Sequence, residues 1–554
     1  MFVGCVALAT SCDLTENVQV KADKSMIFGS KSGLELYSNS FYKALPTLKN
    51  GFMQDKMCDV GAVSNTDTFI KQGAYNTETA TSWSWGALKN INYFIDGCND
   101  PKYCTVDDNT RDNYLGIARW FRAWFYYDKL TTYGEVPWFP HDIQSYQNDV
   151  MYKDRDSRDV IIRNLIADLD FAYEHIQATS STGSSTLTRW AAAALKSRVC
   201  LFEAAYRRYH NLTELEITPE ELYREAAKAA KLVIDNSGCS LNTAAGKKGA
   251  YRDLFYSETP LTQEVILAVC ANEKSGIFGE QNWWFNARSY GLCWSLVRSF
   301  VHTYLKLDGT PFTDAADYAV KSFTEEMEGR DLRLEQTVRG RNFLWDGKTA
   351  VADIKNLSLT GYQVIKYTLD ESKYDGGAKN INSIPLIRYA EVLLNYAEAQ
   401  AELGIIIDSE WALTVGALRK RAGITGGTET LPTTVDGYLQ RTFYPDVTSP
   451  VLLEIRRERA IELVAEGMRF DDLRRWKCGS LMETLPWSGI HIPGLEQPVD
   501  VNGDGVDDYY FTEGEVTAAP AAYRNIAIRV NQALPLQLHQ LGYSALYLGT
   551  GYGF

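Results

Sequence analysis

The sequence lacks any apolar run long enough to cross a lipid bilayer. A transmembrane helix needs about 18 or more apolar residues in succession, and no stretch of the 554-residue chain reaches that length. Positive charge is also scarce, because 56 lysines and arginines stand against 70 aspartates and glutamates, a formal net charge of −14. Such a surface repels phosphate backbones, and no basic stripe overrides the balance. Nucleic acid is therefore not expected as a ligand.

Signatures of metal chemistry and catalysis are missing as well. None of the ten cysteines forms a C-x-x-C pair or stands at zinc spacing with a histidine. The six histidines show no H-E-x-x-H arrangement. The chain has no G-x-S-x-G elbow and no glycine loop in the strand-to-helix setting that cradles phosphate. These absences predict a protein that is not an enzyme and that carries no catalytic cofactor.

One group of carboxylates still invites an enzymatic interpretation. Glu458, Glu462 and Glu466 follow each other at i, i+4 and i+8, which places them on one face of a helix. A glycosidase needs two carboxylates that flank one bond from opposed elements, and a single helical stripe cannot do that. Several arginines surround the three glutamates in the sequence, so we expect ion pairs between helices instead.

Helical periodicity dominates the rest of the chain. Apolar residues recur at i, i+3 and i+4 in segments 114–134, 159–176, 188–209 and 219–238. Successive starts at 159, 188 and 219 lie 29 and 31 residues apart, close to the period of a helix-turn-helix repeat. Two further long helices are expected at 384–404 and 451–476. The sequence therefore predicts a mainly α fold of stacked helix pairs.

The segment from about residue 250 to 380 is less regular. Short apolar runs alternate there with glycine, asparagine and aromatic residues, and residues 264–271 have the pattern of a short strand. We expect a loop-rich, partly β insertion on one side of the scaffold, and a second set of loops from about 480 to 554. Binding residues are often carried by such loops.

The chain begins with the apolar segment MFVGCVALAT, followed by Ser11-Cys12-Asp13. This start resembles the end of a bacterial lipoprotein signal, which is cut before a cysteine that then carries acyl chains. The charged n-region that normally precedes the apolar run is missing, and Ala9 stands where a leucine is usual. We expect residues 1–11 to be a signal remnant, Cys12 to be lipidated, and residues 12–24 to form a tether.

Five motifs follow one another between about residues 114 and 476. The first is a helix with an Arg-x-x-Arg-Ala core that leads into a Tyr-Gly-x-Val-Pro turn, and the others combine arginines with carboxylates. In chain order they are Arg119, Arg122, Tyr133-Gly134 and Pro137; Arg189-Trp190, Lys196 and Arg198; Arg298, Asp308-Gly309 and Arg330-Asp331; Ile384-Pro385, Arg388, Glu391 and Glu398; and Glu454, Arg456, Glu458, Glu462, Gly467, Arg469 and Asp472. Together they resemble the SusD/RagB family of nutrient-binding outer-membrane lipoproteins. The C-terminal stretch departs from the family pattern, with Ala533-Leu534-Pro535 and Leu541-Gly542-Tyr543 in place of Ile-Pro and Asn-Pro-Gly-Tyr motifs.

The resemblance implies an α-solenoid of tetratricopeptide-like helix pairs, here one domain over residues 25–554. Members of the family sit on the cell surface, cap a TonB-dependent SusC-like transporter, typically bind oligosaccharides through aromatic platforms, and have no catalytic machinery. We therefore expect a lipid-anchored protein of the outer membrane that binds a glycan and delivers it to such a transporter. Two alternatives stay open, a tetratricopeptide-type scaffold that binds a protein or peptide, and a glycoside hydrolase.

Sugar binding favours aromatic side chains, because the C–H groups of a sugar ring pack against the face of an indole while polar groups fix the orientation of the sugar. Tryptophans in irregular, polar segments are better candidates than those in helical motifs. The expected platform residues are Trp83 and Trp283, then Trp284, Trp85, Trp294, Tyr290 and Trp345, with Asn282 and Arg288 as polar partners.

One further motif resembles a calcium loop. Asp500, Asn502, Asp504 and Asp508 supply side-chain oxygens at alternate positions, and the carbonyl of Val506 adds another. A phenylalanine stands where the loop normally has its twelfth-position glutamate. We predict a structural calcium ion at this loop; the alternative is an Asp/Gly-rich surface turn.

Overall fold

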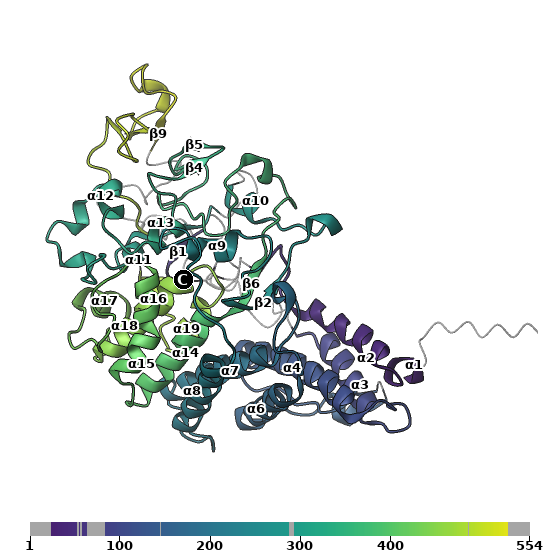
Figure 1. Cartoon of the computed structure of the whole chain (residues 1–554). Coiled ribbons are helices and arrows are strands. Elements are labelled where there is room, and N and C mark those ends of the chain that lie inside the picture. Colours follow the sequence, from purple (N-terminus) through teal and green to yellow (C-terminus); the bar gives the residue numbers. More distant parts are fainter. Residues whose placement is uncertain are drawn as a thin grey trace, which may run out of the picture.

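Helices stacked in sequence order form the scaffold of the molecule, which occupies the lower part of Figure 1. The computed structural model describes residues 24–51, 55, 58–63, 83–144, 146–286, 293–485 and 487–529. The scaffold helices are α3 (Gly86–Asn99), α4 (Asp108–Tyr133), α6 (Arg158–His175), α7 (Arg189–Tyr209), α8 (Pro219–Asn236), α14 (Tyr389–Glu402) and α18 (Pro450–Glu462). Each of them packs against the next. The prediction of a mainly α fold of stacked helix pairs is confirmed.

Local sequence explains where these helices begin and how closely they approach. The Asp107 side chain accepts the Thr110 N–H at 3.0 Å and starts α4. At the start of α8, Thr218 and Glu221 form a reciprocal capping box ahead of the first turn. Alanines on α7 lie buried and let α4 come close enough for the Trp120 indole N–H to donate to the Ala191 carbonyl at 3.2 Å.

The prediction of a helix over residues 384–404 is wrong for its first residues. Its first five residues form β6 (Ile384–Arg388), which pairs antiparallel with β2 (Val265–Val269), and α14 begins only at Tyr389. The strand predicted at 264–271 is thereby confirmed. Short apolar runs fit a strand and a buried helix equally well by periodicity, and here the presence of a strand partner decides.

The expected single helix 451–476 is divided into α18 and α19 (Arg469–Arg475). Between them Ala465 and Gly467 adopt positive φ values of 63° and 80°, which end the helical path. The Gly467 N–H donates to the buried Asp55 carboxylate at 3.0 Å. A long-range contact, absent from the local pattern, thus replaces the helical hydrogen bonds at this break.

The remaining elements are short, and they give the insertion and the C-terminal region the loop-rich, partly β character that was expected. The β4–β5 pair and the β7–β8–β9 sheet lie in the upper part of Figure 1. The short helices are α1 (Lys24–Phe28), α2 (Lys31–Ser38), α5 (Asn148–Met151), α9 (Ala250–Tyr256), α10 (Gln281–Asn286), α11 (Arg298–Val301), α12 (Phe323–Met327), α13 (Arg333–Thr337), α15 (Asp408–Leu413), α16 (Val415–Arg421), α17 (Gly437–Phe443) and α20 (Leu481–Thr484). The other strands are β1 (Gly61–Ala62), β3 (Ser295–Leu296), β4 (Leu344–Trp345), β5 (Lys348–Thr349), β7 (Gln497–Val499), β8 (Tyr509–Thr512) and β9 (Ala527–Arg529). Pairing is antiparallel for β1–β3, β4–β5 and β7–β8 and parallel for β8–β9.

Buried ion pairs tie the insertion to the scaffold. Glu462 is fully buried at the end of α18. Its carboxylate accepts hydrogen bonds from Arg333 Nη1 at 2.8 Å, from Arg388 Nη1 at 2.6 Å and from the Arg421 guanidinium. Although burial opposes the charged form, the three guanidiniums hold the pKa of Glu462 far below its usual range. Glu466 accepts from Arg388 and from Lys366 Nζ, each at 2.7 Å. The prediction that this carboxylate stripe makes ion pairs between elements is confirmed.

Among the helices of the described segments, none combines the length and the apolar composition required to cross a membrane.

Candidate functional site

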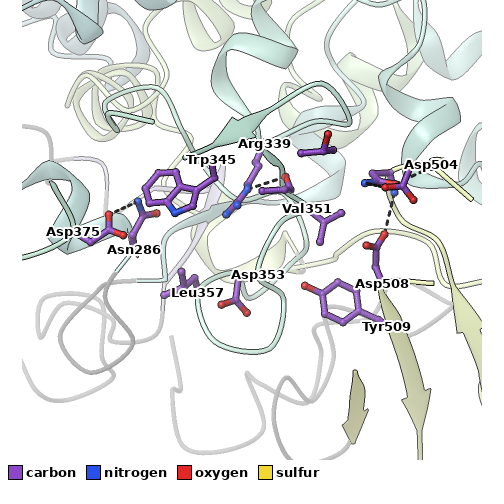
Figure 2. Close-up of a pocket in the computed structure, with 13 residues that line it drawn as sticks. Asn286, Arg339, Trp345, Val351, Asp353, Leu357, Asp375, Asp504, Asp508 and Tyr509 are labelled. Atoms are coloured by element: carbon purple, nitrogen blue, oxygen red, sulfur yellow. Dashed lines mark hydrogen bonds between the residues drawn. The ribbon is translucent and has the colours of Figure 1, made fainter. Parts of the chain in front are cut away.

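A cavity of about 450 Å³ lies beside the β4–β5 hairpin, where the insertion meets the loop before β8 (Figure 2). Its wall is mixed, with one indole, one guanidinium, several carboxylates and amides, and a few aliphatic groups. The lining residues that bear on recognition are Asn286, Arg339, Trp345, Asp353, Asp375, Asn502, Asp504, Asp508 and Tyr509. Residues from four separate stretches of the chain therefore converge on one space.

The β4–β5 hairpin positions Trp345. Asp346 and Gly347 form its two-residue turn with φ values of 50° and 73°, the conformation that Asp-Gly turns favour. Asp346 also accepts the Ser372 N–H at 2.9 Å, which fastens the turn to the insertion. The half-buried Trp345 ring lies 6.2 Å from the Phe343 ring at an interplanar angle of 29°. The indole is thus held as a flat wall of the cavity.

Arg339 provides the cation of the cavity. Its guanidinium carbon lies 4.9 Å from the centre of the Phe343 ring and 5.8 Å from that of Trp345. Nε donates to the Ala350 carbonyl at 3.1 Å and Nη1 to Gln363 Oε1 at 3.3 Å. Burial lowers the pKa of Arg339, but a guanidinium keeps its charge at physiological pH. A fixed cation therefore stands beside the indole (Figure 2).

Carboxylates occupy both ends of the cavity (Figure 2). Asp375 Oδ1 accepts from Asn286 Nδ2 at 3.1 Å and from Asn282 Nδ2 at 3.2 Å, and burial raises the pKa of Asp375. At the other end Asp508 Oδ2 accepts the Val501 N–H at 2.8 Å, and burial also raises the pKa of Asp508. Together with Arg339, these groups offer both donors and acceptors to a ligand, as hydroxyl recognition requires.

Of the residues expected to bind ligand, the cavity brings together Trp345 and three members of the predicted calcium loop, Asn502, Asp504 and Asp508. Trp83 and Trp85 line a second cleft, of about 730 Å³, beside the start of α3. Trp283 and Trp284 are half-buried on α10 and are not among the lining residues of either space.

Two expectations need correction. Trp294 is only 4% exposed and lies against Gly61, where even one added carbon would meet the indole at 2.5 Å. Asn282 is fully buried, and its amide donates to the Leu369 carbonyl at 2.8 Å and accepts the Leu369 N–H at 2.7 Å. Both side chains hold the insertion together instead of facing a ligand.

Three predicted residues, Cys12, Arg288 and Tyr290, lie outside the described residues, as does the departing C-terminal stretch. Sequence reasoning missed Asn286, Arg339, Asp353 and Asp375. The Asp-Gly pair at 346–347 was a usable signal, since it predicts a tight hairpin turn that presents the adjacent tryptophan.

The predicted calcium loop forms a tight turn before β8. Gly503 and Gly505 take positive φ values of 73° and 86°, and their N–H groups each donate to the Asp500 carboxylate at 2.7 Å. Asp504 Oδ1 accepts the Val506 N–H at 2.8 Å. In the described part of the chain, no three His, Cys, Asp or Glu side chains are grouped closely enough to hold a metal ion together. The carboxylates keep further lone pairs, so calcium at this loop stays a prediction.

Comparison with known proteins finds a family model that matches part of the chain. Residues 263–527, which include every lining residue of the Trp345 cavity, match the model of the SusD family. A SusD-like carbohydrate-binding protein of Bacteroides fragilis matches with a TM-score of 0.67 and 19% identity, over 86% of this chain and 94% of that one. A SusD-like protein of the same species matches with a TM-score of 0.61 and 21% identity, over 85% and 91% of the two chains.

A SusD homologue of Bacteroides thetaiotaomicron matches with a TM-score of 0.58 and 18% identity, over 83% of this chain and 89% of that one. No curated protein sequence matches the chain. The described chain therefore has the fold of SusD-like proteins, and its residues 263–527 match the model of the SusD family.

Proposed function

We propose that the chain captures a glycan in the cavity beside Trp345 and delivers it to a TonB-dependent, SusC-like transporter of the outer membrane. In this proposal the chain is anchored to the cell surface through acyl chains on Cys12 and does no chemistry on its ligand.

The observation that carries the proposal is the Trp345 indole, fixed at the wall of a cavity whose other groups are a guanidinium, carboxylates and amides. A sugar ring has an apolar C–H face that packs on an indole, and hydroxyls around its edge that both donate and accept hydrogen bonds. Asp353 and Asp375 can accept from hydroxyls while Arg339 donates to them. The cavity therefore has both kinds of contact that one sugar ring needs.

Charge supports a neutral glycan over an anionic ligand. The cavity holds one arginine and four aspartates, and the chain carries a formal net charge of −14. An anion would be repelled by this field, whereas a neutral sugar is indifferent to its sign. The SusD-like relative of Bacteroides fragilis described as carbohydrate-binding supports the same ligand class.

Affinity electrophoresis against a panel of plant, fungal and host polysaccharides tests the binding claim. Trp345→Ala should lose about tenfold or more in affinity, which corresponds to about 1.4 kcal/mol or more. Trp345→Phe should retain part of the binding because it keeps an aromatic face. Tyr146→Ala is a matched control, since Tyr146 is 80% exposed and does not line the cavity.

Three results would contradict the proposal. If Trp345→Ala binds the glycan as well as the wild type does, the glycan does not bind in this cavity. Binding of peptides and of no polysaccharide would favour the scaffold alternative, and release of reducing sugar would favour a hydrolase. For delivery, the chain should co-purify with a TonB-dependent transporter from native outer membranes, and recovery without one would contradict that step.

A further inference from the structure

The Trp345 cavity carries more negative charge than a neutral sugar needs. Against one arginine, Arg339, its lining holds four aspartates, which are Asp353, Asp375, Asp504 and Asp508. A cleft lined by charge of one sign focuses the field and concentrates ligands of the opposite sign. We propose that the cavity selects a glycan whose sugars carry a free amino group, protonated to ammonium, as in polymers of unacetylated hexosamine. This inference rests on the proposed function, because it names the class of glycan that the same cavity takes.

At one end of the cavity, the Asp375 carboxylate keeps an oxygen for a ligand (Figure 2). Oδ1 accepts from Asn286 Nδ2 at 3.1 Å and from Asn282 Nδ2 at 3.2 Å, whereas no donor among the described residues is bonded to Oδ2. Burial raises the pKa of Asp375, and the neighbouring Asp346 carboxylate raises it more than Arg339 lowers it. Both hydrogen-bond donors are neutral amides, so the negative charge of Asp375 has no cation as a direct partner.

The Asp508 carboxylate is in the same condition at the other end. Oδ2 accepts the Val501 N–H at 2.8 Å and the Asn502 N–H at 3.4 Å, and in the described part of the chain Oδ1 accepts from no donor. Burial raises the pKa of Asp508, and the negative charges of Asp500 and Asp504 raise it further. Because a buried charge is costly unless it is paired, an ammonium group of the ligand would be stabilised at either end of the cavity.

A buried donor defines what else the ligand must carry. Arg339 is 9% exposed, and its Nε and Nη1 already donate to the Ala350 carbonyl and to Gln363. Its Nη2 has no acceptor among the described residues. The two N–H groups of Nη2 can therefore donate to a hydroxyl oxygen of the ligand. A ligand that offers only cations would leave them unpaired, which argues against a plain polyamine.

An unacetylated hexosamine meets all of these requirements on one ring. Its C–H face packs on the Trp345 indole, a hydroxyl accepts from Arg339 Nη2, and the ammonium donates to Asp375 or Asp508. A hydrogen bond between an ammonium and a carboxylate is roughly twice as strong as one between neutral groups. Acetylation of the amine removes the positive charge, and an unsubstituted hexose never has it. Charge therefore distinguishes three sugars that share one ring skeleton.

Isothermal titration with three hexasaccharides of one backbone isolates the contribution of the amino group. The probes are the β-1,4-linked hexamers of glucose, glucosamine and N-acetylglucosamine, which differ only in the hydroxyl, ammonium or acetamide group at C2. The full chain should bind the glucosamine hexamer about tenfold or more tightly than either of the others, because its hydrogen bonds to carboxylates are charge-assisted. This preference should narrow between about 0.1 and 1 M salt, over which the Debye length falls from about 10 to about 3 Å.

Two variants assign the preference to the cavity. Asp375→Asn and Asp508→Asn keep the size of the side chain and remove one negative charge each. Each should lower the affinity for the glucosamine hexamer severalfold and leave the affinity for the glucose hexamer unchanged, which also shows that the cavity is still folded. Asp235→Asn is the matched control, since Asp235 is 48% exposed on α8 and does not line the cavity. It removes the same charge from the chain and should bind all three hexamers as the wild type does.

Several outcomes overturn the inference. They are a glucose hexamer that binds as tightly as the glucosamine hexamer, no binding of any of the three, or an undiminished preference in both cavity variants. Hexalysine tests attraction by net charge alone, and binding of hexalysine as tight as that of the glucosamine hexamer also overturns the inference. If the inference fails in any of these ways while Trp345→Ala still weakens polysaccharide binding, the proposed function stands without it. If Trp345→Ala keeps every affinity while Asp375→Asn loses the preference, the proposed role of the indole fails and the amino-group selection stands.

Discussion

The buried carboxylate of Glu462 offers the sharpest test of how this fold is held together. Glu462 is fully buried and accepts from Arg333 of α13, Arg388 of β6 and Arg421 of α16. Glu462→Gln keeps the shape of the side chain but removes its charge. Each of the three guanidiniums would then lose one charged partner in the interior and keep the others, which are Asp331 and Glu458 for Arg333, Glu264 and Glu466 for Arg388, and Glu264 for Arg421.

The magnitude follows from the burial. Removing one partner of a buried ion pair typically costs about 3–5 kcal/mol, and Glu462 is a partner of three buried guanidiniums. An unfolding entropy of roughly 2.1 cal/mol/K per residue gives about 1.2 kcal/mol/K for 554 residues. Glu462→Gln should therefore lower the melting temperature by about 3–4 °C.

Scanning calorimetry at pH 7 measures this shift. The matched control is Glu216→Gln, which breaks the exposed pair with Arg163, where the two side chains are 80% and 55% exposed. Surface pairs contribute little, so the control should melt with the wild type. Equal melting of Glu462→Gln and the control would refute the reasoning.

Three other predictions concern the loop before β8, the start of the chain and a buried acid. Calcium should raise the melting temperature by ligand linkage, and a chelator should lower it. Asp504→Ala should abolish this difference between the calcium-loaded and the chelated protein. If calorimetry detects no calcium binding at millimolar concentration, the loop is only a turn. Cys12→Ala should release the protein from the membrane fraction, and equal partitioning of the variant would contradict lipid anchoring. Burial raises the pKa of Asp55 from 3.8 to about 7, so the folded chain keeps a proton that the unfolded chain loses near pH 4. The stabilisation from this proton is complete below about pH 4 and is lost as the pH rises to 7. The melting temperature of the wild type should therefore fall relative to Asp55→Asn over this range, and parallel pH profiles would contradict it.

Much of the scaffold could be predicted because its signals are local. The apolar period of segments 159–176, 188–209 and 219–238 depends on residues three or four positions apart, and the structure has helices at all three. The capping box of Thr218 and Glu221 likewise lies within one turn. The carboxylate stripe could be assigned to ion pairs because one helical face excludes the opposed geometry of a glycosidase.

The strand at 384–388 and the break after Glu462 could not be predicted in this way. Each depends on a partner far along the chain, β2 in the first case and Asp55 in the second. The same holds for the Trp345 cavity, where Arg339, Asp375 and Asp508 meet only after the insertion and the C-terminal loops have folded together.

Composition and pattern by themselves determined the helical scaffold, the resemblance to the SusD/RagB family and the set of candidate tryptophans. Only the tertiary structure decided which of those tryptophans face solvent. Trp83 and Trp294 both lie in irregular segments, yet one is 45% exposed and the other 4% exposed. The difference arises because Trp294 packs against a glycine that leaves room for its ring, whereas the described ring contacts of Trp83 are T-shaped ones with Trp85 and Tyr133. Whether an indole becomes core or binding surface is set by the neighbours that the fold brings to it, and a linear sequence does not contain those distances.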